Sequence, residues 1–416
     1  MARRPLFLPA RPGKGDVSVR RPHIPVLILI SLVHLLSHVY IMVIPSLLPL
    51  LPKTLNVSFV ELGAAVSVFN LCSAAAQAPM GFVVDRFGAW RVLFIGIAVG
   101  TGSFIFLFFF PSYVGLLAAM AFAGVANGVY HPSDYAILSR SIRESIMGKA
   151  FSVHSFAGYA GSAMTPALAV ACAVYFGVPA AFGATALLGL AVLALFLVSY
   201  SGDRKADDAL SVARATDKTI ARLPLSAVLT APVFALMVLY IFLCLSTISI
   251  ERFSVSALIQ GYDTALPLAN TALTAFLLCS AFGVLSGGEL ADRTRRHGYV
   301  AVIAFALAAV LSVVLAVASL PPFILVAVYA LIGFLTGVIV PSRDMLVRAA
   351  SPKGGEGKVF GLASTGFNIG GTLGPLMFGY FLDHGMPSAI FWAAAAFMAT
   401  TVCLTWAQEW MRGRKP

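Results

Sequence analysis

Long apolar segments recur along this chain from one end to the other, and they decide what it can fold into. Twelve of them approach or exceed twenty residues, enough for a helix to cross a hydrocarbon layer roughly 30 Å thick. Open backbone cannot face lipid, and the segments lack the alternation of barrel strands, so we expect helices. Only 11% of the residues are charged, against about a quarter in soluble domains. The sequence therefore predicts an all-α polytopic membrane protein with twelve transmembrane helices.

The boundaries of these segments divide the chain into five parts. The expected helices cover 23–50, 59–84, 91–110, 113–139, 149–174, 179–200, 226–251, 265–288, 299–319, 322–345, 358–382 and 387–408. The longest polar interval, 201–223, has the composition of a domain linker. We therefore expect a tail, a six-helix bundle, a linker, a second six-helix bundle and a second tail at 1–22, 23–200, 201–223, 224–408 and 409–416.

The positive charges lie almost entirely on one side of the expected membrane. Of the 28 lysines and arginines, all but Lys53 and Arg252 fall in the tails, the linker or the turns on the same side. Cytoplasmic segments of membrane proteins carry such an excess. We therefore expect an integral multi-pass protein of a bacterial inner membrane, with both termini cytoplasmic. Topology accounts for the net charge of +11, so we expect no nucleic-acid partner.

Patterns typical of cofactor binding and of catalysis are missing from the sequence. The five cysteines fall in five different apolar segments, without the spacing of a metal site or a disulfide framework. The phosphate-binding pattern Gly-x-x-x-x-Gly-Lys-Ser/Thr is not present. No nucleophile and base stand in a catalytic pattern. We therefore expect no enzyme activity, no metal and no cofactor.

A short charged motif occurs once in each half of the chain. The first copy covers 81–91 (GFVVDRFGAWR), and the second covers 288–296 (GELADRTRR). In both copies a glycine is followed four residues later by an acid and then directly by an arginine. Both copies also stand at the end of an apolar segment, which indicates one device used twice in a duplicated protein.

The duplication extends into the neighbouring helices. The fourth and fifth segments match the tenth and eleventh at a constant offset of 209 residues. The matched pairs are Gly124 and Gly333, Gly128 and Gly337, Pro132 and Pro341, Ser133 and Ser342, Gly148 and Gly357, Lys149 and Lys358, Phe151 and Phe360, Ser155 and Ser364, Gly161 and Gly370, and Pro166 and Pro375. Glycine and proline dominate these pairs, as expected where helices pack closely or bend.

With these features the chain resembles the major facilitator superfamily over nearly its whole length. The resemblance implies two six-helix bundles related by pseudo-two-fold symmetry, which rock about a site at the bilayer midplane. It also implies that the glycine of the motif permits close helix contact, while the acid and arginine pair with neighbouring helix ends to latch one conformation. The implicated residues are Gly81, Asp85, Arg86, Gly88, Arg91, Gly288, Asp292, Arg293, Arg295 and Arg296. Ala89 and Trp90 stand where that family often has basic residues.

Two stretches are similar to the fosmidomycin-resistance type of exporter within that superfamily. One covers 34–40 (HLLSHVY) with 45–49 (PSLLP), and the other is 130–132 (YHP). An aspartate often stands in those exporters where this chain has His38. This resemblance implies the export of a small molecule.

Four histidines lie inside the first six apolar segments, where histidine is uncommon. His34 and His38 are one helical turn apart and share a face near mid-depth, whereas His131 and His154 are expected nearer the cytoplasm. An imidazole titrates near pH 6.5, so these residues are candidates for proton coupling or for binding an anion. Alternatively, each is neutral and hydrogen-bonds a carbonyl or hydroxyl. We expect no metal site, because three different helices would have to converge.

Several other polar residues lie inside apolar segments. Asp134 is three residues past His131 and fits a cytoplasmic gate better than a substrate contact. Glu251 and Arg252 are expected to end the seventh helix on the outer side, where the arginine could meet an anionic substrate, close a gate or form an interfacial ion pair. The remaining candidates for the substrate pathway are Tyr40, Asn127, Asn270 and Asn368. The asparagines suit either a hydrogen-bonding cavity or helix association.

We expect a secondary active transporter that moves a small organic molecule by alternating access, as a proton-coupled exporter of a drug or metabolite. The first alternative is a proton-coupled importer of an organic anion. The second is a non-transporting sensor or assembly protein of the same fold, although a static protein has no need of duplicated latches and intramembrane histidines. The expected partners are the substrate, protons and the lipid bilayer, and we expect a monomer.

Overall fold

The computed structural model describes residues 23–143, 146–200, 230–294, 296–350 and 356–412. Within these residues the fold is all α-helical, without strands. The long helical segments are α1 (His23–Leu47), α3 (Phe59–Phe87), α4 (Ala89–Phe109), α5 (Tyr113–Ser141), α6 (Met147–Phe176), α7 (Val178–Tyr200), α9 to α10 (Ala231–Tyr262), α11 (Leu266–Arg293), α12 (His297–Val317), α13 (Pro322–Ala350), α14 (Glu356–Asp383) and α15 (Ser388–Arg412). The predicted tail 1–22, the linker 201–223 and residues 413–416 lie outside the described part.

The long segments have the length and surface of membrane helices. Eleven of those in the described part are long and apolar enough to cross a bilayer. The twelfth, the glycine-rich α14, has 28 residues. Large apolar side chains point outward, and Phe82, Val198 and Phe323 are 77%, 78% and 85% exposed. Lipid can cover such a surface, whereas water would disfavour it. The prediction of an all-α polytopic protein is confirmed.

The seventh helix differs from the prediction of an end at residue 251. It continues from α9 (Ala231–Ile248) through one π-helical turn, η3 (Ser249–Phe253), into α10 (Ser254–Tyr262). The whole segment is long and apolar enough to form one membrane span. The expectation was wrong because a Glu-Arg pair in an apolar run resembles a membrane boundary. Here that pair lies inside the span.

Local hydroxyl groups help to explain the π-helical turn. Ser246 and Thr247 both donate to the carbonyl of Leu243, and Ser249 donates to the carbonyl of Ser246. Such bonds from side chain to backbone compete with regular helical bonding one turn earlier in the chain. Single π-helical turns are rare and are found frequently at functional sites.

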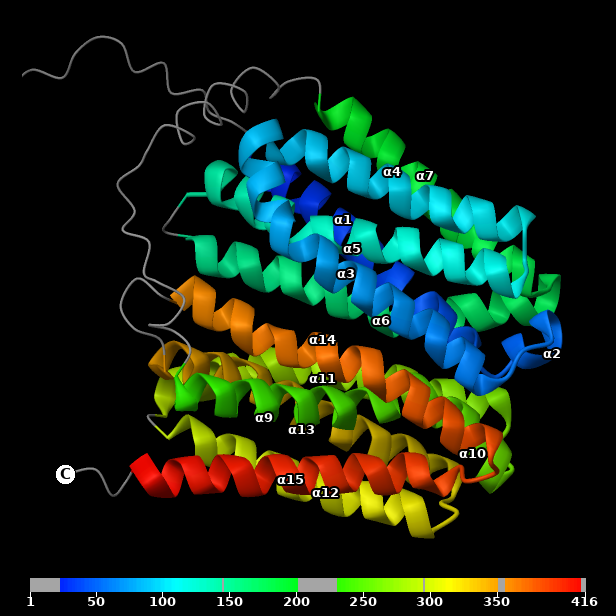
Figure 1. Cartoon of the computed structure of the whole chain (residues 1–416), viewed down its shortest axis with the longest axis vertical. Coiled ribbons are helices and arrows are strands. Elements are labelled where there is room, and N and C mark those ends of the chain that lie inside the picture. The colour runs from blue at the N-terminus through cyan, green and yellow to red at the C-terminus, as the bar shows by residue number, and fades with distance from the viewer. Residues whose placement is uncertain (1–22, 144–145, 201–229, 295, 351–355, 413–416) are drawn as a thin grey trace, which may run out of the picture.

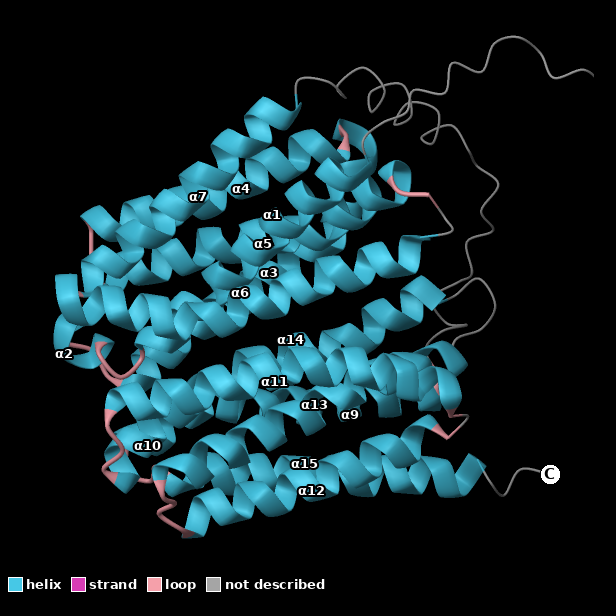
Figure 2. Ribbon diagram, turned by 180° about the vertical axis from the view of Figure 1, so that it is seen from behind, coloured by secondary structure: helices cyan, strands magenta, loops and turns pink. Residues whose placement is uncertain are grey.

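The helices form two six-helix bundles that lie side by side (Figures 1 and 2). One contains α1 and α3 to α7, and the other contains α9 to α15. We call the end where α15 finishes the terminus end, and the opposite end, which carries the short helix α2 (Leu51–Leu55), the α2 end (Figure 1). Between the bundles, α3 packs on α14 and α6 packs on α11.

Equivalent contacts within the two bundles confirm the internal duplication. In each bundle, two glycines of one helix lie so close to a neighbouring backbone that an added Cβ would overlap it. The approaches are Gly124 to Phe69, Gly128 to Ser73, Gly333 to Phe276 and Gly337 to Ser280. The glycines differ by 209 residues and their partners by 207, which is also the offset between the two charged motifs. The bundles therefore repeat not only residues but also the packing that those residues permit.

At the α2 end the two bundles are held together across α3 and α14. The carboxylate of Asp383, the last residue of α14, accepts the backbone N–H groups of Phe59 and Val60, both at 2.8 Å. Further along, Ser67 donates to the carbonyl of Thr372 at 2.6 Å and Asn70 to that of Gly371 at 2.7 Å. This chain of polar contacts joins the bundles along the half of α3 nearest the α2 end.

Candidate functional site

A cavity of about 290 Å³ lies between the two bundles. Its walls come from α1 and α6 on one side and from η3 and the helices of the second bundle on the other. Four of its lining side chains carry or can carry charge, namely His38, Glu251, Arg252 and Arg343. Tyr159, Ser162, Thr247, Ser280 and Thr336 add hydroxyl groups. A polar cavity in this position suits the binding of a small polar molecule.

The π-helical turn supplies two of the charges. Glu251 and Arg252 are consecutive in sequence, and both line the cavity. The expectation that they end the seventh helix on the outer side is wrong, because the helix continues for another ten residues to Tyr262. Ionisable groups inside a membrane span are costly and are usually paired or facing water. Their place on the cavity wall satisfies that requirement.

Arg343 supplies a second guanidinium group, which the sequence-based choice of site residues omits. It lies over the rings of Tyr240 and Phe367, each centroid 5.1 Å from its guanidinium carbon. Stacking of this kind holds a planar cation in one orientation. The sequence does contain a signal for this residue, because the offset of 209 places Arg343 opposite Asp134. The two bundles thus carry an acidic and a basic residue at equivalent positions.

The four intramembrane histidines form one cluster within the first bundle. The ring of His34 lies 4.8 Å from that of His38, 5.2 Å from that of His131 and 3.9 Å, stacked, from that of His154. The residues come from α1, α5 and α6. The separate depths expected for the two pairs are therefore not observed, and three helices do converge.

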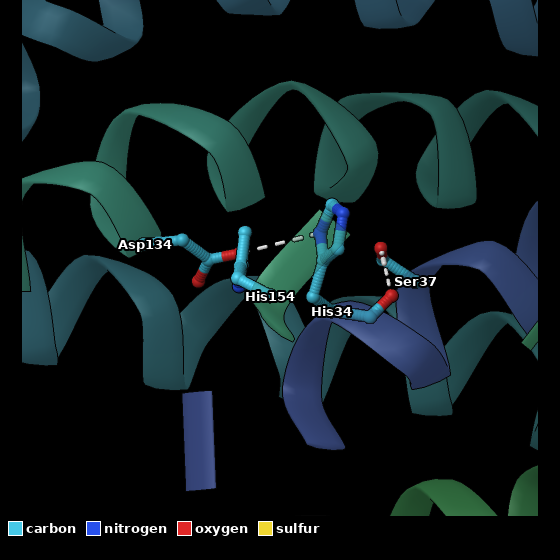
Figure 3. A network of polar contacts seen from close by, with 4 residues as sticks. All are labelled: His34, Ser37, Asp134 and His154. Atoms are coloured by element: carbon cyan, nitrogen blue, oxygen red, sulfur yellow. Dashed lines mark hydrogen bonds and ion pairs between the residues drawn. The ribbon is translucent and has the colours of Figure 1, made fainter. Parts of the chain in front are cut away.

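Asp134 lies within this cluster and not in a separate gate near the membrane surface. Its Oδ2 atom is 3.5 Å from Nδ1 of His34 and 3.6 Å from Nε2 of His154. Figure 3 shows the carboxylate pointing towards both imidazoles, with Ser37 donating to the carbonyl of His34. All three side chains are almost completely buried, with exposures of 4%, 0% and 1% for His34, Asp134 and His154.

His38 connects the buried cluster to the cavity. It lines the cavity, contacts His34 and shares a hydrogen bond of 2.9 Å between its Nδ1 and Oγ of Ser162. Gly158 on α6 makes room for both imidazoles, since an added Cβ would lie 2.7 Å from Nε2 of each. The sequence shows the spacing of His34 and His38, but it does not show that a glycine on another helix faces them.

The other predicted pathway residues lie apart from the cavity lining. Tyr40 bonds to Oγ1 of Thr101 at 2.9 Å inside the first bundle. Asn127 donates to Ser73 at 2.8 Å, which joins α5 to α3. Asn270 lies on α11 beside α6, in a second pocket near the α2 end. Asn368 is on α14, where its carbonyl accepts a hydrogen bond from Thr372.

The first charged motif forms the turn between α3 and α4. Gly88 has a φ of 88°, which ends one helix and starts the next and is a conformation that favours glycine. Arg86 lies over the ring of Phe87 at 5.4 Å. Arg91 is exposed and borders an apolar pocket formed by α3, α4 and α5. The side chain of Asp85 lies outside the described part.

The second copy of the motif lies at the end of α11. Arg293 pairs with Glu289 in the same helix, and Arg296 lies over the ring of Tyr299 at 5.8 Å. The side chain of Asp292 and all of Arg295 lie outside the residues that the structure describes. The expected close contact at the motif glycines is not present among those residues. An added Cβ on Gly81 or Gly288 meets nothing within 4 Å, because the close approaches fall at other glycines.

Comparison with solved structures shows the fold. A bacterial homologue of the human lysosomal transporter Spinster, in an inward-facing and unoccupied conformation, matches with a TM-score of 0.72. The match covers 95% of this chain and 99% of the other, at 12% sequence identity. The same homologue in an inward-facing and occupied conformation matches with a TM-score of 0.71.

Curated relatives extend the similarity to proteins named as transporters. An uncharacterised transporter of Bacillus subtilis, YfnC, is 28% identical over 86% of this chain and 87% of its own length. The fosmidomycin resistance protein of Escherichia coli is 27% identical, over 85% and 86%. The multi-drug resistance efflux pump PmrA of Streptococcus pneumoniae is 24% identical, over 82% and 83%. The model of the Major Facilitator Superfamily matches residues 30–269 and 250–409. The chain therefore belongs to the Major Facilitator Superfamily of multi-pass membrane transporters and is not an enzyme.

Proposed function

We propose that this protein is a proton-coupled secondary transporter that exports a small amphoteric organic molecule. The observation that carries the proposal is the presence of two guanidinium groups and one carboxylate in the same cavity between the bundles. The names of two relatives, a fosmidomycin resistance protein and a multi-drug resistance efflux pump, support export.

The substrate chemistry follows from the charges. Arg252 and Arg343 offer planar donors that suit a carboxylate or phosphate-like group. Glu251, from the same π-helical turn, offers an acceptor for an amino group or another donor on the substrate. Aromatic and aliphatic side chains, among them Phe276 and Phe367, form the apolar part of the wall. A molecule with an acidic end, a donor group and a small apolar body would use all three.

Glu251 also gives a physical route to proton coupling. The other titratable or charged side chains that line the cavity are His38, Arg252, Arg343 and Tyr159. A proton on its carboxylate removes the negative charge that attracts a cationic amino group of the substrate. Proton and substrate would therefore bind in alternation, and an inward proton gradient would drive the substrate outward through alternating access.

A substrate that binds only to the two arginines would have the opposite dependence on the protonation of Glu251. The charged Glu251 would then compete with the substrate for the arginines, and a proton on Glu251 would favour substrate binding. Proton and anion would move together, which is the importer alternative. The cavity contains both kinds of partner, and the amphoteric substrate is the one that uses them all.

Substrate flux in proteoliposomes with an imposed pH gradient tests the proposal. A panel of amphoteric, purely anionic and cationic molecules is first screened by the thermal shift of the purified protein. For each hit, a pH-sensitive dye reports whether protons move against the substrate or with it. Glu251→Gln should weaken binding and abolish pH-driven export while exchange of substrate for substrate continues.

The result that overturns the export proposal is equally specific. If Glu251→Gln tightens binding, or if protons move with the substrate, the protein is a symporter of an organic anion. Asn270→Ala serves as the matched control, because Asn270 lies in a separate pocket beside α6 and should leave coupling unchanged.

The placement of the chain in the membrane follows from the charge distribution. We propose that the terminus end faces the cytoplasm of a bacterial inner membrane, because nearly all lysines and arginines belong to that side. The bundles at 23–200 and 224–408 would then rock about the cavity, with 201–223 as their linker and the monomer as the working unit. The two charged motifs at the terminus end would limit that motion.

A further inference from the structure

We propose that His34, Asp134 and His154 form a binding site for one divalent transition-metal ion, such as Zn²⁺ or Co²⁺. The site lies inside the first bundle, where α1, α5 and α6 meet, and is separate from the residues on which the proposed substrate binding rests. Each residue offers one ligand atom, and the three atoms lie within 4.8 Å of one another. Figure 3 shows the carboxylate of Asp134 directed towards the imidazoles of His154 and His34.

The distances suit a shared metal better than hydrogen bonds. Oδ2 of Asp134 is 3.5 Å from Nδ1 of His34 and 3.6 Å from Nε2 of His154. Both separations exceed the usual range of a hydrogen bond between nitrogen and oxygen. Ligands about 2.0–2.1 Å from a tetrahedral Zn²⁺ are roughly 3.4 Å apart. The two separations from Asp134 are therefore close to those expected for neighbouring ligands of one ion. The imidazoles of His34 and His154 are stacked, so both rings would turn to bring their lone pairs onto that ion.

Buried polar atoms without hydrogen-bond partners also support a metal ion at this site. Nδ1 of His34, both nitrogens of His154 and both carboxylate oxygens of Asp134 lack a hydrogen-bond partner among the described groups. Buried polar atoms in proteins are nearly always satisfied, because a buried atom without a partner costs about 1–3 kcal/mol. An ion held by one atom of each side chain would satisfy three of these groups at once.

The ligand types decide which ions fit. Two imidazoles and one carboxylate favour Zn²⁺, Co²⁺ or Ni²⁺, whereas Mg²⁺ and Ca²⁺ prefer oxygen ligands throughout. Three protein ligands also leave a fourth coordination position for water or another group. His131 borders the site, since its ring lies 5.2 Å from that of His34, and its Nδ1 atom likewise has no hydrogen-bond partner among the described residues.

Cobalt titration of the purified full-length protein, with any affinity tag removed, tests this proposal. Tetrahedral Co²⁺ gives strong visible absorption that octahedral Co²⁺ in buffer lacks. We expect one Co²⁺ per chain, displaced by Zn²⁺ and not by Mg²⁺. X-ray absorption of the zinc form of the wild-type protein should show two imidazole ligands, a result that does not depend on whether any variant folds.

Variants then assign the ion to these residues. His154→Gln and Asp134→Asn should each lower the affinity for Co²⁺ by at least about tenfold, because even the loss of a residue that only supports a metal ligand costs about 10–100-fold. His384→Gln is the matched control, because His384 is an exposed histidine at the α2 end. Equal losses in all three variants, or a wild-type protein without tetrahedral absorption, would overturn the proposal. Binding that survives in His154→Gln and Asp134→Asn would overturn it as well.

Discussion

The contact between Asp383 and the start of α3 gives a prediction whose size follows from the structure. The carboxylate accepts two backbone N–H groups at 2.8 Å across the interface between the bundles. A hydrogen bond to a charged group contributes about 1.5–3 kcal/mol, and the positive helix N-terminus adds roughly 0.3–1 kcal/mol. Because Asp383 is exposed to solvent, the lower part of these ranges applies. Asp383→Asn keeps one acceptor oxygen and loses the charge, so it should cost about 1–2 kcal/mol.

That cost applies to one side of a conformational equilibrium. Alternating access requires the α2 end to separate at some stage, and the contact is lost in the separated form. Asp383→Asn should therefore shift the population towards the separated form by roughly five- to thirtyfold. The stability of the individual bundles should change little, because the contact lies between them.

Distances between two spin labels measure this shift. Labels at Thr54 and His384, both exposed at the α2 end, report separation of the bundles in a background whose five native cysteines are replaced. Glu61→Gln is the matched control, because Glu61 caps the same helix through Ser58 and makes no described contact with α14. The reasoning fails if Asp383→Asn leaves the distance distribution unchanged, or if Glu61→Gln shifts it equally.

Three further predictions concern packing, the turn and the cavity. Gly124→Ala should lower the thermal midpoint, because the added Cβ would push α3 away. In Gly102→Ala the added Cβ would meet nothing within 4 Å, so this variant should be more stable by up to about 1 kcal/mol. Equal effects of the two substitutions would contradict the packing account. Gly88→Ala should cost roughly 1–3 kcal/mol, because φ is 88° and ψ is 136° there, a conformation almost confined to glycine. An unchanged thermal midpoint would show that the turn relaxes. Arg343→Gln should weaken substrate binding at least about tenfold, as expected for a lost charged hydrogen bond. Arg343→Lys should recover only part of that loss, and full recovery in a binding assay would show that charge alone matters.

The fold was predictable because its signals are local and repeated. Apolar length alone identified each helix, and Gly88 marked the turn between α3 and α4. The repeated glycines anticipated close packing, since Gly124 and Gly333 occupy equivalent places in the two bundles. Two elements of the described part were not anticipated. The short helix α2 follows the first span, and the seventh helix runs on to Tyr262 although Glu251 and Arg252 interrupt its apolar run.

The sites were less predictable because they depend on contacts between helices. The sequence singles out His34, Asp134 and His154 one by one, but it cannot show that α1, α5 and α6 bring them within 4.8 Å. It likewise assigns Arg252 to the membrane surface, since the cavity that receives the side chain is built by other helices. The sequence places Arg343 at the position equivalent to Asp134. A comparison of the repeats selects residues that match, however, and these two residues differ.

That difference has a consequence for how the molecule can hold its ligands. Two identical bundles would carry the same side chain at both positions, so charged ligands bound there would share one sign. Here Asp134 lies buried in the first bundle and Arg343 lines the cavity from the second. The two repeats therefore differ at this pair of positions in the kind of ionisable group that they carry. A cation bound in the first bundle and an anion bound at the second would then attract each other. Binding of either ligand would therefore raise the affinity for the other.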